Sequence, residues 1–270
     1  MKITGLMLIA VSVIFFTGKT LAQEYKLVWS DEFNGTKLDS SKWSCEIGNH
    51  NGWGNKEKEY YRSRNAVVKD GYLTIIAKKE NYKDFDYTSA RIRTIHKGDW
   101  KYGKFEMRAK LPIGKGMWPA FWMMPTDNVY GGWPVSGEID IMEYLGHDSA
   151  TVYGTIHYGG RPPNNTHSGK MYTLPDSGFN SGFHTFSLIW EKDSIQWLVD
   201  GKVYETQTKW YTTAASYPAP FDQKFHIILN LAVGGEWPGY PDSTTVFPQK
   251  YVIDYVRVYQ KEMDSDKNGE

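Results

Sequence analysis

Residues 194–204 have the sequence Ser-Ile-Gln-Trp-Leu-Val-Asp-Gly-Lys-Val-Tyr, which predicts a β-hairpin. Short runs rich in apolar and β-branched side chains lie on both sides of Asp200 and Gly201, as strands require. Asp-Gly favours a two-residue type I′ turn, because both central residues of that turn need a positive φ. A tight turn between two short strands is typical of an antiparallel sheet.

Similar short segments, often alternating between apolar and polar residues, recur along the chain. We expect further strands at residues 72–77, 103–111, 183–190 and 251–259. No stretch shows a sustained apolar period of 3.6 residues, and we find no internal repeat and no interdomain linker. The sequence therefore predicts one all-β domain, a sandwich or a barrel, over residues 23–261.

Charge and aromatic content narrow the classes of function. The chain has 31 Lys and Arg against 31 Asp and Glu, whereas a protein that binds a nucleic-acid backbone normally has a clear basic excess. We therefore expect no nucleic-acid partner. The 11 Trp, 19 Tyr and 12 Phe are more rings than a core of this size needs, so we expect some of them to face a ligand.

The N-terminus has the pattern of a secretory signal peptide. A short basic start is followed by an apolar run at residues 5–16 and by small residues at 20–22. That run is shorter than the roughly 20 residues of a membrane span, and no later segment is apolar enough to qualify. We expect cleavage after residue 22, a secreted or periplasmic monomer without a lipid anchor, and a polar tail at residues 262–270.

Three acidic residues lie on one predicted strand. Residues two apart in a strand point to the same face, so Glu138 and Asp140 project together. Strict alternation would bury the carboxylate of Glu143 in the core, which is energetically expensive. We predict a β-bulge at Ile141 and Met142, which returns Glu143 to the acidic face.

The surroundings of these acids indicate a sugar-binding cleft. The neighbouring aromatic and imidazole side chains are Trp118, Phe121, Trp122, Trp133, Tyr144 and His157. Sugars stack their C–H faces on such rings and need polar partners for their hydroxyls. Two Glu carboxyls about 5–6 Å apart would suit a retaining glycosidase. The alternatives are solvated acids on an outer strand face and a metal site, for which acids with a single His are a poor transition-metal set.

Four motifs resemble glycoside hydrolase family 16, and within it the bacterial laminarinases, which are endo-β-1,3-glucanases. They lie at residues 116–125, 138–143, 153–158 and 229–239, and the likeness extends over about residues 25–260. The resemblance implies a β-jelly-roll sandwich of two antiparallel sheets, concanavalin A-like, with the acidic strand on the concave sheet beneath an open cleft. It also implies hydrolysis with retention of anomeric configuration.

The resemblance implies a role for each acid. Glu138 corresponds to the nucleophile, Glu143 to the general acid/base, and Asp140 to the carboxylate that tunes the protonation of Glu138. The nucleophile must be ionised and the acid protonated, so the site has to hold their pKa values apart. No cofactor is needed for this chemistry.

The resemblance also implies residues that bind substrate and metal. The substrate-binding side chains are expected to be Trp118, Trp122, Arg91, Asn49, His157, Trp133, Asn230 and Trp237. A structural Ca²⁺ on the convex face, far from the cleft, is expected to take oxygen ligands from Glu32, the backbone of Gly71, and Asp254.

The expected partner is a β-glucan polysaccharide. The bulged strand resembles that of laminarinases and favours β-1,3 bonds, with mixed-linkage β-1,3-1,4-glucan as a further substrate. One departure is Glu59, where many laminarinases have Gln. The alternatives are an agarase or carrageenase, for which a sulfated galactan favours a more basic cleft, and a non-catalytic β-glucan-binding lectin, which typically lacks one or both acids.

Overall fold

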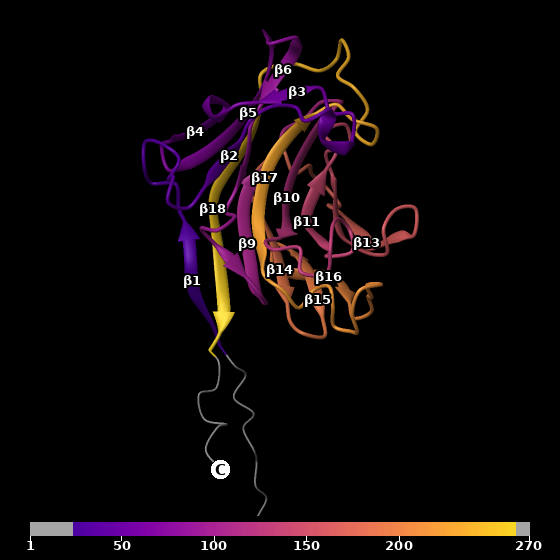
Figure 1. Ribbon diagram of the computed structural model, residues 1–270. Helices are drawn as coiled ribbons and strands as arrows, with labels where there is room; N and C mark the ends of the chain where they lie inside the picture. The colour runs from indigo at the N-terminus through magenta and orange to yellow at the C-terminus, as the bar shows by residue number, and fades with distance from the viewer. Residues whose placement is uncertain (1–23, 263–270) are drawn as a thin grey trace, which may run out of the picture.

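The computed structural model describes residues 24–262, which form two large, mainly antiparallel β-sheets (Figure 1). Within these residues the helical segments are two short 3₁₀ turns, η1 (Gly52–Gly54) and η2 (Ser63–Asn65). The prediction of an all-β sandwich is therefore confirmed. The expected signal peptide, residues 1–22, and residues 263–270 of the expected tail lie outside the described residues.

The ten-stranded sheet has the order β16-β15-β14-β9-β18-β5-β6-β3, with β1 paired to β18 and β4 paired to β5. Its strands are β1 (Tyr25–Asp31), β3 (Glu59–Tyr61), β4 (Ala66–Lys69), β5 (Tyr72–Tyr82), β6 (Phe85–Ser89), β9 (Gly103–Lys110), β14 (His184–Trp190), β15 (Ile195–Val199), β16 (Lys202–Gln207) and β18 (Gln249–Lys261). The short strand β3 pairs with β6 in parallel.

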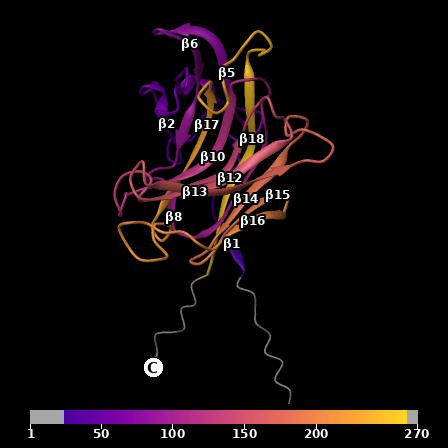
Figure 2. The ribbon, with the colours of Figure 1, turned by 90° about the vertical axis from the view of Figure 1, so that its right-hand side faces the viewer.

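The eight-stranded sheet has the order β13-β12-β11-β10-β17-β7-β2, with β8 paired to β17. Its strands are β2 (Ser44–Glu46), β7 (Arg91–Arg93), β8 (Asp99–Trp100), β10 (Met117–Pro125), β11 (Glu138–Tyr144), β12 (Thr151–Gly159), β13 (Asn165–Thr173) and β17 (Phe225–Val233). Figure 2 views the molecule from the side of this sheet, with β12 and β13 toward the viewer.

The predicted hairpin is confirmed. Asp200 and Gly201 connect β15 to β16 with φ values of 49° and 78°, as a type I′ turn requires. The other strands expected from the sequence are also present, as β5, β9, β14 and β18 of the ten-stranded sheet. Buried and partly exposed residues alternate strictly along β9, so its pattern is readable from sequence.

The core lies between the two sheets. Phe105 and Met107 of β9 and Leu229 and Leu231 of β17 are fully buried members of one continuous hydrophobic cluster. Burying a side chain of this size contributes about 1.5–3 kcal/mol. All nine residues of β17 are buried, because one of its faces meets the core and the other lies beneath the cleft described below.

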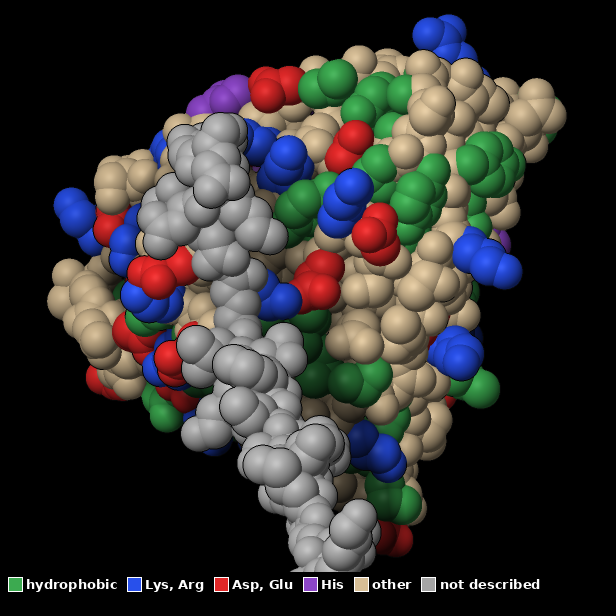
Figure 3. Space-filling view, turned by 90° about the horizontal axis from the view of Figure 1, so that it is seen from below, with side chains coloured by type: hydrophobic (Ala, Val, Ile, Leu, Met, Phe, Trp, Pro, Cys, Tyr) green, Lys and Arg blue, Asp and Glu red, His purple; other side chains and the backbone are tan. Residues whose placement is uncertain are grey.

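The two ends of the described chain lie side by side. Strands β1 and β18 are antiparallel neighbours, which brings Tyr25 opposite Lys261 at the lower end of the molecule (Figure 1). Figure 3 views this end from below and shows Lys and Arg interspersed with Asp and Glu.

Candidate active site

A cavity of about 640 Å³ lies over the outer face of the eight-stranded sheet. Its floor is built by β7, β10, β11, β12 and β17, and residues 53–57 contribute to its wall. Most of the predicted site residues line it, namely Arg91, Trp118, Trp122, Trp133, Glu138, Asp140, Glu143, His157, Asn230 and Trp237. The structure therefore brings together residues that are far apart in the sequence.

The predicted β-bulge in β11 is present. Between Asp140 and Glu143, β11 places Ile141 and Met142 opposite a single residue of β12, and the pairing with β10 shifts at the same point. Both bulge side chains are buried in the core, while the carboxylate of Glu143 faces the cavity. The bulge thus places all three acids on one face, as expected from the cost of burying Glu143.

The carboxylate of Glu138 accepts a hydrogen bond from the indole N–H of Trp133. Burial raises the pKa of Glu138 to about 8, and the negative charge of Asp140 adds to this increase. The charge of His157 and the Trp133 hydrogen bond act in the opposite direction, because both favour the ionised form. Glu138 is therefore a carboxyl group whose charge depends on its immediate neighbours.

Glu143 lies on the other side of the bulge. Its Oε1 accepts a hydrogen bond of 3.1 Å from the indole N–H of Trp118. Burial and the charges of Asp140 and Glu138 hold the pKa of Glu143 well above its usual range. A carboxyl group in this environment holds its proton to higher pH than a free carboxyl group does, which suits a general acid.

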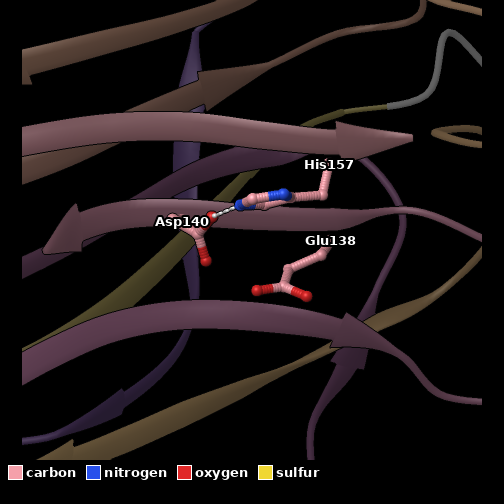
Figure 4. A group of neighbouring side chains, drawn as sticks. All are labelled: Glu138, Asp140 and His157. Carbon is pink, nitrogen blue, oxygen red and sulfur yellow. Dashed lines mark ion pairs between the residues drawn. The ribbon is translucent and has the colours of Figure 1, made fainter. Parts of the chain in front are cut away.

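Asp140 and His157 form an ion pair beside Glu138. The distance from His157 Nε2 to Asp140 Oδ2 is 3.3 Å, and Figure 4 shows Glu138 beside this pair. Burial alone would lower the pKa of His157, but its contact with Asp140 and the charges of both glutamates raise it to about 9. The imidazole is therefore a cation at neutral pH.

The positive charge of His157 also bears on metal binding. The ligand atoms of Glu138, Asp140 and His157 lie within 4.8 Å of one another, which would be close enough for one ion. A protonated imidazole, however, has no lone pair to donate to a metal. The arrangement favours an acid–base cluster over a metal centre.

Aromatic rings cover the rest of the cleft. Trp122 donates a hydrogen bond of 2.8 Å from Nε1 to Oδ1 of Asn230, which fixes the ring on the floor. The guanidinium of Arg91 lies between two indoles, 4.2 Å from the ring centre of Trp53 and 4.8 Å from that of Trp122. Such a wall offers flat apolar surface with polar edges, as sugar rings require.

Comparison with known proteins assigns the family. Residues 54–257 match the sequence model described as glycosyl hydrolases family 16. The chain belongs to glycoside hydrolase family 16. The resemblance on which the sequence analysis relied is thereby confirmed.

Individual relatives of this family 16 chain are similar to it in sequence over most of its length. It is 42% identical over 258 residues to a β-glucanase of Rhodothermus marinus, covering 88% of this chain and 86% of the relative. It is 45% identical over 260 residues to glucan endo-1,3-β-glucosidase A1 of Niallia circulans, where it spans only 38% of the relative's length and 87% of its own. The solved laminarinase catalytic domain of Thermotoga petrophila RKU-1 superposes with a TM-score of 0.81 at 46% identity, covering 89% of this chain and 100% of that domain. The expected jelly-roll sandwich is confirmed.

Asn49 is not among the residues that line the active-site cleft of this family 16 chain. Its side-chain amide donates to the carbonyl oxygens of Glu57 and Glu59, at 3.0 and 2.8 Å, and its Oδ1 accepts from the backbone N–H of Gly52. These bonds use both amide donors and one lone pair of Oδ1, and they hold the loop before β3. Asn49 lines a neighbouring hollow with Glu57, and its expected role in sugar binding stays a prediction.

The carboxylates of two expected calcium ligands pair with arginines. Both carboxylate oxygens of Glu32 accept hydrogen bonds of 2.9 Å from Arg257, and Asp254 pairs with Arg108. Gly71, with a φ of 80°, is the second residue of the tight turn between β4 and β5. Glu32 and Asp254 thus have other partners in this structure, and the calcium site stays a prediction.

The sequence analysis missed several residues that line the cleft. They include Trp53, Asn55, Glu57 and His167. Trp53 stands between two glycines and has a φ of 53°, so the glycines on either side were an available signal of an exposed turn. The contact of its ring with Arg91 joins residues distant in sequence and was not available. In the described part of the chain, no helix is long and apolar enough to cross a membrane.

Proposed function

We propose that this family 16 chain is an endo-acting β-glucanase that hydrolyses β-1,3 bonds with retention of configuration. Laminarin is the proposed substrate, and mixed-linkage β-1,3-1,4-glucan a further one. The observation that carries the proposal is the bulged strand that places Glu138 and Glu143 on one face of an aromatic cleft. Relatives named glucan endo-1,3-β-glucosidase and laminarinase support the choice of linkage.

In the first step, the carboxylate of Glu138 attacks C1 of the sugar while the bond from C1 to the leaving oxygen breaks. Glu143 donates its proton to that oxygen, so the leaving chain departs as a neutral alcohol. The indole of Trp133 donates to Glu138 and that of Trp118 to Glu143, which holds both carboxyls in place. The product is a glycosyl ester of Glu138.

In the second step, Glu143 acts as the base. Ester formation removes the negative charge of Glu138, which is one cause of the raised pKa of Glu143. The pKa of Glu143 therefore falls, and its carboxylate can take a proton from water. The water oxygen attacks C1, Glu138 leaves, and two inversions give net retention.

The Asp140–His157 pair balances charge beside the nucleophile. Asp140 is 2% exposed, and its charge raises the pKa of Glu138, whereas the charge of His157 lowers it. We propose that the charge of His157 offsets the effects of burial and of Asp140, so that Glu138 loses its proton before Glu143 does. No cofactor takes part in either step.

The proposed function also includes the cellular location and the oligomeric state of the enzyme. We propose that residues 1–22 are removed on export, that residues 23–261 form the catalytic domain, and that the enzyme acts as a secreted or periplasmic monomer. Its partner is a soluble or particulate β-glucan.

The other readings of the cleft receive less support. A lectin would not need both Glu138 and Glu143 aimed into the cavity beside indole donors. A sulfated galactan would need cationic groups free to bind sulfate. Among the lining residues, Arg91 is paired with Glu46 and His157 with Asp140.

Release of reducing sugar from laminarin, barley mixed-linkage glucan and agarose, measured in parallel, tests the proposal. We expect rapid release from laminarin, with oligosaccharides as early products, and loss of all release in Glu138→Gln. The control is Glu24→Gln, which removes an exposed carboxylate next to β1 of the other sheet and should leave the rate unchanged. Preferential release from agarose, or binding of laminarin without cleavage, would overturn the assignment.

A further inference from the structure

A second pair of carboxyl groups lies beside the cleft, at Glu57 and Glu59. Glu59 is fully buried on the inner face of β3, and Glu57 is 6% exposed. Lone buried carboxylates are rare because ionisation in a poorly solvated site is expensive. Two such groups facing each other need a specific chemical arrangement.

The hydrogen bonds of the pair are unequal. Both oxygens of Glu57 accept hydrogen bonds, from Asn55 Nδ2 at 3.1 Å and from the hydroxyl of Tyr61 at 3.0 Å. Oε2 of Glu59 accepts a hydrogen bond of 2.6 Å from the backbone N–H of Val233. Oε1 of Glu59 is buried and has no donor among the described residues, while the Glu57 carboxylate faces it.

We propose that Glu59 is a neutral carboxylic acid that donates its own proton to the Glu57 carboxylate, and that this shared proton positions one wall of the cleft. A proton on Oε1 turns an orphaned acceptor into a donor and removes one of two buried negative charges. Glu59 is then a positioning residue, because it acts on the substrate site through Glu57.

The charges around Glu57 and Glu59 favour one proton shared between the two carboxyl groups. Burial and the charge of Glu57 raise the pKa of Glu59 well above its usual range. Burial and both carboxyls raise the pKa of Tyr61 as well, which keeps its hydroxyl a donor. Among the nearby cations, Arg91 of β7 is paired with Glu46, Lys56 with Glu236, and the ammonium of Lys58 lies over the ring of Tyr240.

The pair lies where two cleft-forming loops meet. The N–H of Lys58 donates to the carbonyl of Val233 at 2.8 Å, and the N–H of Glu236 donates to the carbonyl of Asn55 at 3.0 Å. These bonds join residues 52–58, which include Trp53, to residues 233–239, which include Trp237. Loss of the shared proton would place two like charges at this junction and separate the loops.

A hydrogen-bond chain also connects the pair to the floor of the cleft. Glu57 accepts from Tyr61, whose hydroxyl oxygen accepts from Asn230 Nδ2 at 3.1 Å. Asn230 in turn accepts from the indole of Trp122 at 2.8 Å. A displacement of Glu57 would therefore shift Trp122, a ring to which the proposed function assigns substrate binding.

The first test is the pH dependence of unfolding in wild type and Glu59→Gln. The amide of Gln can donate to Glu57 without titrating. A carboxyl whose pKa is raised on folding loses stabilising free energy as pH rises above its unfolded value of about 4.3. We expect the free energy of unfolding of wild type, relative to Glu59→Gln, to fall steadily with pH from about 4.5 upward. A difference that stays constant from pH 5 to 9 would overturn the proposal, and Glu24→Gln, which removes an exposed carboxylate next to β1, is the control for a flat response.

The second test uses KM for laminarin and rests on the proposed function. Wild type should show a several-fold rise in KM at alkaline pH that Glu59→Gln lacks. Glu59→Met, which is neutral but cannot donate, should have a raised KM at every pH. Equal behaviour of the Gln and Met variants would contradict a shared proton. The unfolding test does not require activity, so failure of the proposed function is distinguishable from failure of this inference.

Discussion

The indole N–H of Trp197 donates a hydrogen bond of 2.8 Å to the backbone carbonyl of Asp140. Trp197 lies on β15 of the ten-stranded sheet and Asp140 on β11 of the eight-stranded sheet, so the bond crosses the core. It reaches β11 at the bulge, where pairing with neighbouring strands shifts. A side chain of one sheet thus holds the strand that carries the acids of the other.

Replacement of Trp197 by Phe should therefore reduce both stability and catalysis. Loss of a donor to a buried carbonyl costs about 1–3 kcal/mol. A shift of the acidic strand of about 1 Å would reduce kcat/KM by about a hundredfold. The control is Trp210→Phe, whose indole donates to the carbonyl of Pro218 at 2.8 Å. Both variants should lose similar thermal stability, and a normal kcat/KM in Trp197→Phe would refute the link to the acids.

The charge of His157 should set the pH range of activity. It lowers the pKa of both Glu138 and Glu143, so His157→Gln should move both limbs of the kcat/KM profile to higher pH, by about one unit. His157→Gln should also remove a stabilising contribution that wild type has below pH 6.5 and loses as pH rises through about 9. His167→Gln, in the same cleft, is the matched control. An unmoved profile would show that the imidazole is not the cation described.

Trp237 should contribute to substrate binding with little effect on stability. Its side chain is 43% exposed and meets the rings of Trp118 and Tyr153 edge-on, at 5.6 and 5.0 Å. We expect Trp237→Ala to raise KM for laminarin several-fold with a nearly unchanged melting temperature. The control is Tyr217→Ala, which removes a 47% exposed ring stacked on Trp210. A collapse of thermal stability in Trp237→Ala would mean that the ring is structural.

The sequence predicted features that depend on neighbouring residues. The turn at Asp200 and Gly201 follows from their tolerance of positive φ, and the bulge follows from the cost of burying Glu143. Both are present, and both arise from forces acting within a few residues. The family resemblance supplied most of the remaining site.

Features that depend on residues far apart in the chain were harder to predict from the sequence. The direction of the Asn49 amide is set by carbonyls of the following loop, and the carboxylates of Glu32 and Asp254 are taken by arginines far along the chain. No local sequence pattern predicts the stacking of Arg91 on Trp53. Strand β17 is buried on both faces and so lacks the alternation that reveals a strand.

The role of Glu143 as acid predicts a dependence on the leaving group. Glu143→Ala should lose nearly all hydrolysis of laminarin, because the leaving alcohol needs a proton. An aryl β-glucan oligosaccharide with an acidic phenol should still release its phenol in an initial burst. Stopped-flow absorbance measures that burst. Equal loss on both substrates would argue against Glu143 as the acid.

The nucleophile can be identified directly by trapping. A 2-fluoro laminari-oligosaccharide with a good leaving group should form a stable ester, and mass spectrometry of the digested protein should place the label on Glu138 within residues 138–143. Nuclear magnetic resonance of the natural reaction should show the β-anomer as the first product. A label on Glu143, or an α-anomer released first, would contradict the retaining mechanism built on Glu138 and Glu143.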